Sequence, residues 1–490
     1  MKKTKTVLAE VLTPKLKKNK PDLKRIAGYS ATVILCSIVI GAILRLFNWG
    51  EFGSAGDFFR GKVIGEIFLI AAIFALMIAV LLVYSMMLKS VHVERNKILP
   101  IILSAMILSY LVGILFAQTV SLYAIPACFA PLIIAVLIEK RVGIVANILM
   151  SQAFFVTYLL VFGTSAVIDA AASLPASVVS GTLMIIFADR ADTRLKFIGM
   201  GLIVGLVSAL IPILVSLLLS GGGAYEILIS GVWGFVANVL SVALFMVLLP
   251  FFESLFRVDT IFRISEICSL DFPLLKELAK NAPGTFNHSV AVGNLAELCA
   301  LAIGENPQLA KAAAYYHDVG KLKNPECFIE NQKGYNPHDD FIPEVSVSMI
   351  TAHTRHGAEM IRKARLPDIL ASVALEHHGT TPVQYFLYKA QNVTEDTLDR
   401  TEFSYPGPKP SSKIAAIIMI VDTVEAATRA MGGPTEDDFR GFVRKLIKSK
   451  ADLGQFSDCD ITYKDLQLIE DVLVAVLPSM YHSRIQYQSK

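Results

Sequence analysis

The chain has 490 residues, of which 54% are hydrophobic, and a net charge of +3 at neutral pH. A mean hydropathy of +0.56 excludes an ordinary soluble protein, because part of so apolar a chain must lie in lipid. Residues 1–25 hold nine Lys and Arg against Glu10 and Asp22, a charge of +7, so the rest of the chain totals −4. The basic excess is a terminal tail, and no face for a nucleic-acid polymer is expected. Six scattered cysteines without a CxxC pair predict reduced packing residues.

Apolar runs of the length needed to cross a hydrocarbon layer of ~30 Å follow the basic tail. The first run, 26–44, lacks a convincing cleavage signal and is predicted to remain as an anchor. The other runs predict seven further spans, at 64–88, 98–118, 120–138, 142–164, 170–188, 197–219 and 225–251. Prolines within these runs are tolerated kinks that could equally shape a ligand cavity; they are Pro126, Pro131, Pro175 and Pro212.

The distribution of Lys and Arg predicts the orientation of the spans, since these residues collect in cytoplasmic loops. Lys89, Arg95 and Lys97 fall in one predicted inner loop, whereas only the first of the predicted outer loops carries any Lys or Arg. An even number of spans then places both termini in the cytoplasm. We therefore expect a multi-pass protein of the bacterial plasma membrane, with the lipid bilayer as a partner.

Ordinary soluble composition begins near Arg257, and the remaining residues suffice for one domain. Apolar residues there recur at helical spacing with no convincing strand, and 391–413 is predicted to be a long loop. The expected fold class is all-α, a polytopic transmembrane helix bundle followed by an all-helical cytoplasmic domain. The predicted parts are a basic tail (1–25), a first transmembrane helix with a short outer loop (26–62), a seven-helix transmembrane domain (63–252), a connecting helix (253–270) and a cytoplasmic domain (271–490).

Seven of the nine histidines crowd into 91 residues, namely His288, His317, His338, His353, His356, His377 and His378. Helical segments that each send a polar side chain inward must pair it or bind it to a metal. Asp318, next to His317, has two oxygens and can bridge two cations ~3.5–4 Å apart. With Asp422 in a later apolar helix, the pattern predicts a two-metal centre. Imidazole-rich ligation favours iron or manganese, with zinc also open, over magnesium.

Several polar residues near this cluster have two interpretations. Lys321, one turn past His317, could hold a phosphate oxygen or be a solvated lysine at a helix end. Arg355 is a weaker candidate for substrate binding. His356 could replace His353 as a ligand, whereas His338 and His482 fit a structural role better.

Short motifs connect the chain to a known family. His317-Asp-Val-Gly-Lys321 resembles the HD motif of the HD phosphohydrolase superfamily. Over residues 60–490 the chain resembles the PgpH-type 7TM-HD family of bacterial membrane proteins, through the motifs at 283–289, 328–332, 377–380, 405–410, 421–426 and 481–485. Members of that family usually carry a large extracytoplasmic domain after the first span, where this sequence has only residues 47–62. A natural short form and an engineered deletion both fit the linker-like run at 50–56.

The resemblance implies a cyclic di-AMP phosphodiesterase, a hydrolase that opens the ring to pApA with two divalent metal ions, manganese or iron. By position, one ion would take His288, His317, Asp318 and Asp422, and the other would share Asp318 and take His353, His377 and His378. Asp318 and Lys321 would be catalytic, and Lys321 and Arg355 would bind substrate. The Gly-Tyr-Pro signature of cyclic di-GMP enzymes is missing after His378, and a homodimer is an open expectation.

Two other functions predict different sequence features. A membrane receptor whose HD domain binds a nucleotide messenger without hydrolysing it would be favoured by the loss of a ligand position, and none is lost. A transporter would need paired charges deep in the spans. Glu66, Asp169 and Glu226 instead lie near predicted span ends, which is typical of interfacial residues.

Overall fold

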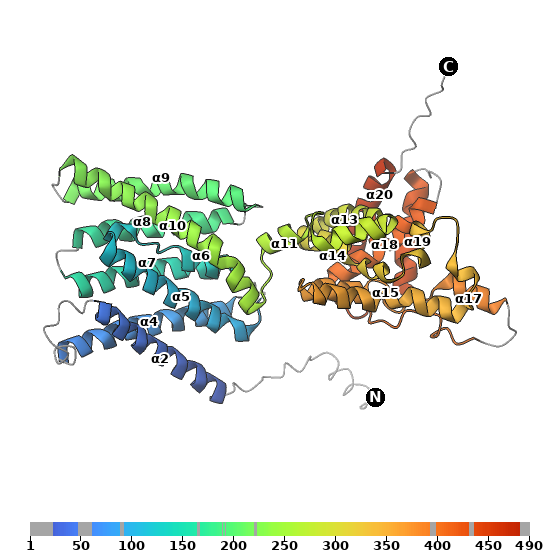
Figure 1. The fold of residues 1–490 in the computed structure, drawn as a ribbon, viewed down its shortest axis with the longest axis horizontal. Helices are drawn as coiled ribbons and strands as arrows, with labels where there is room; N and C mark the ends of the chain where they lie inside the picture. Colours follow the sequence, from blue (N-terminus) through green and yellow to red (C-terminus); the bar gives the residue numbers. More distant parts are fainter. Residues whose placement is uncertain are drawn as a thin grey trace, which may run out of the picture. The chain divides into compact units, whose positions relative to one another are not determined.

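The computed structural model describes residues 23–47, 61–88, 93–163, 167–188, 190–191, 193–219, 223–392, 398–430 and 436–480. The chain divides into two compact units, Met1–Thr260 (unit 1) and Ile261–Lys490 (unit 2) (Figure 1). The predicted all-α class is confirmed, since the only strand-like pairing in the described ranges is one isolated bridge between Pro382 and Ser404. Most of the predicted tail and outer loop, together with His482 and the motif at 481–485, lies outside the described residues.

Unit 1 is a multi-pass membrane bundle. Its helices are α2 (Leu23–Phe47), α4 (Gly61–Met87), α5 (Arg95–Thr119), α6 (Phe129–Leu137), α7 (Lys140–Phe162), α8 (Val167–Ala188), α9 (Arg194–Leu219) and α10 (Ala224–Phe256). Six of them, α4, α5 and α7 to α10, contain segments long and apolar enough to cross a membrane. Helices α8, α9 and α10 pack as successive neighbours, as Figure 1 shows. These helices correspond to six of the eight predicted spans.

The predicted fourth span, 120–138, is wrong as a continuous membrane-length helix. A short 3-10 turn, η2 (Leu122–Ala124), is followed by non-helical residues and then by α6. Nine helical residues extend only roughly 13 Å, less than half of a hydrocarbon layer. Pro126, which has no N–H to donate, lies in the gap. Almost every residue of α6 is buried, so protein covers this irregular backbone, as a broken segment inside a membrane requires.

The predicted connecting helix, 253–270, is also wrong in extent. Helix α10 ends at Phe256, and Arg257 adopts a left-handed conformation with φ of 51°, its N–H bonded to the Glu253 carbonyl. That conformation cannot continue a right-handed helix. A separate helix, α11 (Ile261–Ile267), begins four residues later, just beyond the boundary of the two units at Thr260.

Unit 2 is an all-helical domain built around α13. After α11 it contains α12 (Pro273–Asn281), α13 (Pro283–Ile303), α14 (Pro307–Tyr316), α15 (Pro343–Lys363), α16 (Asp368–Glu376), α17 (Gln384–Gln391), α18 (Lys413–Ala430), α19 (Glu436–Asp452) and α20 (Tyr463–Met480). Helix α13 is apolar enough to resemble a membrane span, but it packs against α14, α18 and α20 within this unit. Its apolar character therefore reflects a buried core helix. All six cysteines are unpaired, as predicted.

Candidate metal centre

Five separate segments of unit 2 supply the predicted metal ligands. Helix α13 carries His288, α15 carries His353 and α18 carries Asp422. His317 is the C-terminal cap of α14 and is followed by Asp318, and His377 is the C-terminal cap of α16 and is followed by His378. Apart from the half-buried His378, all of these residues are buried. The fold thus gathers all seven predicted ligand positions in one place.

The first half of the site contains His288, His317 and Asp318, whose ligand atoms all lie within 4.8 Å of one another. The Asp318 Oδ2 atom is 3.3 Å from His317 Nε2 and 3.8 Å from His288 Nε2. Asp422 joins this half through Oδ1, which is 2.9 Å from His288 Nε2. Two imidazole nitrogens therefore face two carboxylates.

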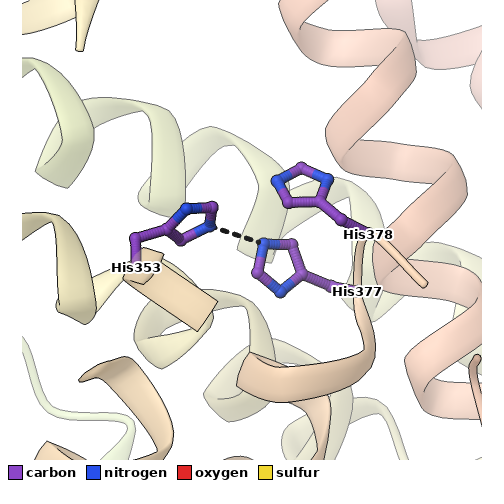
Figure 2. Close-up of side chains that lie close together, drawn as sticks. All are labelled: His353, His377 and His378. Atoms are coloured by element: carbon purple, nitrogen blue, oxygen red, sulfur yellow. Dashed lines mark hydrogen bonds between the residues drawn. The ribbon is translucent and has the colours of Figure 1, made fainter. Parts of the chain in front are cut away.

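The second half is a group of three histidines, His353, His377 and His378 (Figure 2). The Nε2 atoms of His353 and His377 point at each other, as the dashed line shows, and are 3.3 Å apart. His378 Nδ1 is 3.8 Å from Asp422 Oδ2. Imidazole nitrogens that converge in this way, without an acid among the three rings, are suited to share a cation.

Asp318 lies between the two halves and presents one carboxylate oxygen to each. Its Oδ2 faces His288 and His317, whereas its Oδ1 is 3.2 Å from His353 Nε2 and 3.6 Å from His377 Nε2. A carboxylate in this position can bridge two cations. This geometry agrees with the sequence-based expectation that Asp318 is shared.

Backbone carbonyls select the tautomer of three of the histidines. The Nδ1–H of His317 donates to the Ala314 carbonyl at 2.6 Å, that of His353 to the Ile350 carbonyl at 2.6 Å, and that of His377 to the Ala374 carbonyl at 2.9 Å. A carbonyl only accepts, so the proton must be on Nδ1. In the neutral form of each ring the lone pair is then on Nε2, which faces Asp318, so loss of one proton from a charged ring leaves it ready to act as a ligand.

Burial and nearby charges set the protonation of the site. Burial raises the pKa of the Asp318 carboxyl, but His317 and Lys321 lower it by more, so it stays well below its usual value. Burial lowers the pKa of His317, and Asp318 raises it further than that, to about 10. For His377, burial dominates and lowers the pKa to about 4. Asp318 is thus ionised and His377 neutral at pH 7, the states that metal ligands require.

The donor set fits a transition-metal ion. Among the described residues, His317 Nε2 and Asp318 Oδ1 are buried and have no hydrogen-bond partner. A buried polar atom without a partner is unfavourable, and a cation between these atoms would remove that penalty. Imidazole nitrogens with a few carboxylate oxygens suit iron, manganese or zinc. The site is therefore a candidate metal centre.

Cation binding at this site should strengthen as the pH rises. With a pKa of about 10, His317 is protonated at neutral pH in the metal-free protein, so a cation must displace that proton. One displaced proton makes the affinity rise by about tenfold per pH unit. Titration calorimetry of the full chain with Mn²⁺ at pH 6, 7 and 8 measures this slope. An affinity that is independent of pH over this range would contradict the assignment of His317 as a ligand.

Lys321 and Arg355, the predicted substrate-binding residues, differ in their placement. The Nζ of Lys321 lies 2.7 Å from Asp318 Oδ2 and 2.9 Å from Glu330 Oε1, so it is not a solvated lysine at a helix end. Arg355 is exposed, because two residues along α15 rotate its side chain roughly 200° from His353. The structure therefore brings Lys321 into contact with Asp318, whereas substrate binding by the exposed Arg355 stays a prediction.

The two other histidines of the described part of unit 2, His338 and His356, are not in the ligand groups. His356 is half-buried, and burial together with Arg355 lowers its pKa. His338 is buried in another part of the unit, where its Nε2–H donates to the Cys327 carbonyl at 2.8 Å and its ring packs on Phe386. His353, and not His356, therefore lies in the group of three histidines that could hold a metal ion.

Four residues to which the sequence assigned no role also belong to the site. Glu425 accepts from His288 Nδ1 at 2.5 Å, and Arg429 donates to Glu425 in turn. The Glu330 carboxylate pairs with Lys321, and the Tyr405 ring lies 4.2 Å from that of His378. Glu425 follows Asp422 by three residues, one turn of α18, and this spacing could have identified it.

Replacing Glu425 with Ala should weaken Mn²⁺ binding by about 10- to 100-fold, because His288 loses the acceptor that orients its ring. Glu425→Gln should lose less, since the amide oxygen still accepts from Nδ1. Calorimetry on the full chain measures both variants. Glu297→Ala is the matched control in α13, because Glu297 pairs with Lys311 and not with a ligand. Equal Mn²⁺ affinity in Glu425→Ala and wild type would show that Glu425 does not support the site.

Comparisons with known families match both units. The family model described as an HD domain matches residues 285–427, and the one described as a 7TM receptor with intracellular HD hydrolase matches residues 64–260. Cyclic-di-AMP phosphodiesterase PgpH of Bacillus subtilis is 37% identical over 379 residues, which cover 74% of this chain and 51% of the relative. The protein of the same name from Listeria monocytogenes is 36% identical over 382 residues, covering 76% and 52%. The chain thus spans about half the length of these relatives.

Unit 2 also resembles solved structures. The HD domain of the L. monocytogenes phosphodiesterase PgpH in complex with cyclic-di-AMP is 44% identical, with a TM-score of 0.42. The alignment covers 44% of this chain and all of that domain. A second structure of the same domain is 43% identical, with a TM-score of 0.41, and covers 43% of this chain.

Proposed function

Since the chain belongs to the 7TM-HD family, which joins a membrane receptor region to an intracellular HD hydrolase, we propose that it is a metal-dependent phosphodiesterase that hydrolyses cyclic di-AMP to pApA. The observation that carries the proposal is Asp318, whose two oxygens face two separate groups of histidines. The two PgpH relatives, both named cyclic-di-AMP phosphodiesterases, support this choice of substrate.

The proposed site holds two divalent ions, manganese or iron. His288, His317, Asp318 and Asp422 would hold one, and Asp318, His353, His377 and His378 the other. When bound, such ions supply an activated water for in-line attack on phosphorus and neutralise charge on the phosphoryl oxygens. No side-chain nucleophile is then required.

The other residues of the site orient and balance these ligands. Lys321 binds the Asp318 oxygen that faces His288 and His317, and Glu330 holds the Lys321 ammonium on its other side. Lys321 therefore fixes the rotation of the Asp318 carboxylate. Its ammonium is a positive group beside the proposed metal ligands, and we propose that it also binds a phosphate oxygen of the substrate. Arg355, which is exposed two residues after His353 on α15, stays a weaker candidate for substrate binding.

We further propose that unit 2 and both termini face the cytoplasm, where a nucleotide messenger would be available. The excess of Lys and Arg in the predicted inner loops supports this orientation. Labelling of single cysteines introduced into each loop, in intact cells with an impermeant thiol reagent, tests it. Reaction of a cysteine placed in unit 2 would contradict the proposal.

Product analysis of the full chain tests the activity. Purified protein in lipid nanodiscs is incubated with cyclic di-AMP and Mn²⁺ or Fe²⁺, and the nucleotides are separated by chromatography. We expect pApA to form, and cyclic di-GMP to be cleaved more slowly. Cyclic di-AMP that binds but stays intact under either metal would overturn the proposal in favour of a receptor that signals without hydrolysis.

A further inference from the structure

A part-enclosed cavity lies within unit 1, where the broken segment around η2 meets α7, α8, α9 and α10. Water-sized molecules can place their centres in about 40 Å³ of it. One water needs roughly 10–15 Å³ on this measure, so an occupant would be small. Most of the wall is apolar, and its polar side chains come from the broken segment and all four helices. They include Tyr123, Ser151, Ser177, Ser208, Asn238 and Ser241.

Two serine hydroxyls of this wall, those of Ser208 and Ser241, use their protons within their own helices. Ser208 Oγ donates its proton to the Gly205 carbonyl of its own helix at 3.0 Å, and Ser241 Oγ donates to the Ala237 carbonyl at 2.8 Å. A hydroxyl has one proton and two lone pairs. Once the proton is used within the helix, the lone pairs remain to accept from a molecule in the cavity.

Asn238 provides a stronger indication of a ligand. Its side chain is 2% exposed, and its Nδ2 donates to the Gly201 carbonyl of α9 at 2.7 Å. Among the described residues, its Oδ1 has no hydrogen-bond partner, although Asn238 lines the cavity. A buried carbonyl oxygen without a donor is unfavourable by about 1–3 kcal/mol. A donor in the cavity would remove that penalty.

The charges near the cavity favour a positively charged hydrogen-bond donor over an anion. Tyr123, which lines the cavity, donates to Asp169 Oδ1 at 2.6 Å. Among the described lining residues there is no Lys or Arg. Lone pairs on the wall, with a carboxylate beyond Tyr123, attract a positive donor and repel an anion.

We propose that this cavity binds a small protonated amine, about the size of methylammonium or ethanolamine. Its N–H groups would donate to Asn238 Oδ1 and to the hydroxyl oxygens of Ser208 and Ser241, and its carbon atoms would contact the apolar wall. A site of this kind is a small-molecule pocket lined mainly by apolar groups, with a few convergent polar atoms. The proposal does not depend on the hydrolase activity of unit 2.

Thermal unfolding of the full chain in nanodiscs tests the proposal. Methylammonium chloride and ethanolamine hydrochloride are titrated at constant ionic strength, and sodium acetate is the anionic comparison. We expect a saturable rise in Tm with each amine, because a ligand of the folded state stabilises it, and no such rise with acetate. The absence of a saturable rise with both amines, or an equal rise with acetate, overturns the proposal.

Variants locate the binding site. Ser208→Ala with Ser241→Ala should weaken the amine response by about tenfold, since two acceptors are lost. Asn238→Leu should abolish the response, and the serine pair keeps the test decisive if this variant fails to fold. Ser109→Ala is the matched control, because Ser109 is fully buried in α5 and does not line the cavity. An unchanged amine affinity in the serine pair, or an equal loss in Ser109→Ala, would contradict the assignment.

Discussion

Asp318→Asn should reduce hydrolysis of cyclic di-AMP by on the order of 10³-fold or more, the size of effect seen when a preorganised electrostatic group is lost from an active site. The change keeps the shape of the side chain but replaces one oxygen with an NH₂ group. If the NH₂ group takes the place of Oδ2, its hydrogens face His317 Nε2 and the Lys321 ammonium. If it takes the place of Oδ1, they face His353 Nε2. Because Asp318 faces both halves, the substitution should also lower the content of both bound ions.

Two measurements on the full chain separate this effect from unfolding. Product formation gives the activity, and elemental analysis of the purified protein gives the metal content. Asp271→Asn is the matched control, since the Asp271 side chain is 86% exposed and pairs only with Lys276 in the described part of the chain. Full activity in Asp318→Asn would exclude Asp318 as the shared ligand. Normal metal content with lost activity would restrict its role to catalysis.

Gly320→Ala should destabilise unit 2 by more than about 3 kcal/mol, at the upper end of the range for overpacked sites. A Cβ atom at this position would lie 1.9 Å from the His353 carbonyl oxygen and 2.4 Å from the Gly357 nitrogen. Both are backbone atoms of α15, so no side-chain rotation can relieve the contact. The contact also sets the distance between Asp318 and His353, and metal binding should fall with stability.

Chemical unfolding of the full chain, followed by a probe placed in unit 2, measures the loss. Gly441→Ala in α19 is the control, because nothing lies within 4 Å of a Cβ there, and alanine favours a helix by up to about 1 kcal/mol. If Gly320→Ala and Gly441→Ala are equally stable, the close approach of α15 to the Asp318 segment is not a constraint on the fold.

The grouping of the candidate metal ligands in one place could be predicted from the sequence because several of them are adjacent pairs. His317 with Asp318, and His377 with His378, place polar groups at the ends of apolar helices, where burial requires a partner. The sequence is less informative about the face of a helix on which a residue lies. Nearness in the sequence predicts that Arg355 lies beside His353, but His353 is buried and Arg355 is exposed.

Hydropathy also gives a wrong prediction where an apolar run does not form one continuous helix. Residues 120–138 are as apolar as a membrane span, so composition alone predicts one continuous element. The turn at η2 and the shortness of α6 depend on packing against neighbouring helices, which a single run does not reveal. The sequence leaves two interpretations open for the prolines of the spans, and Pro212 is the one of them that lines the cavity in unit 1.

The location of His317 and His377 at helix ends has an electrostatic consequence. Both are C-terminal caps, of α14 and α16, so the negative ends of two helix dipoles converge on the metal ligands. Each such end stabilises a cation by about 0.3–1 kcal/mol at an exposed position, and by up to ~2 kcal/mol where it is partly buried. The attraction of this site for cations is therefore built into the backbone as well as into the side chains. Part of this attraction for cations should therefore remain when Asp318 or Asp422 is replaced by a neutral residue.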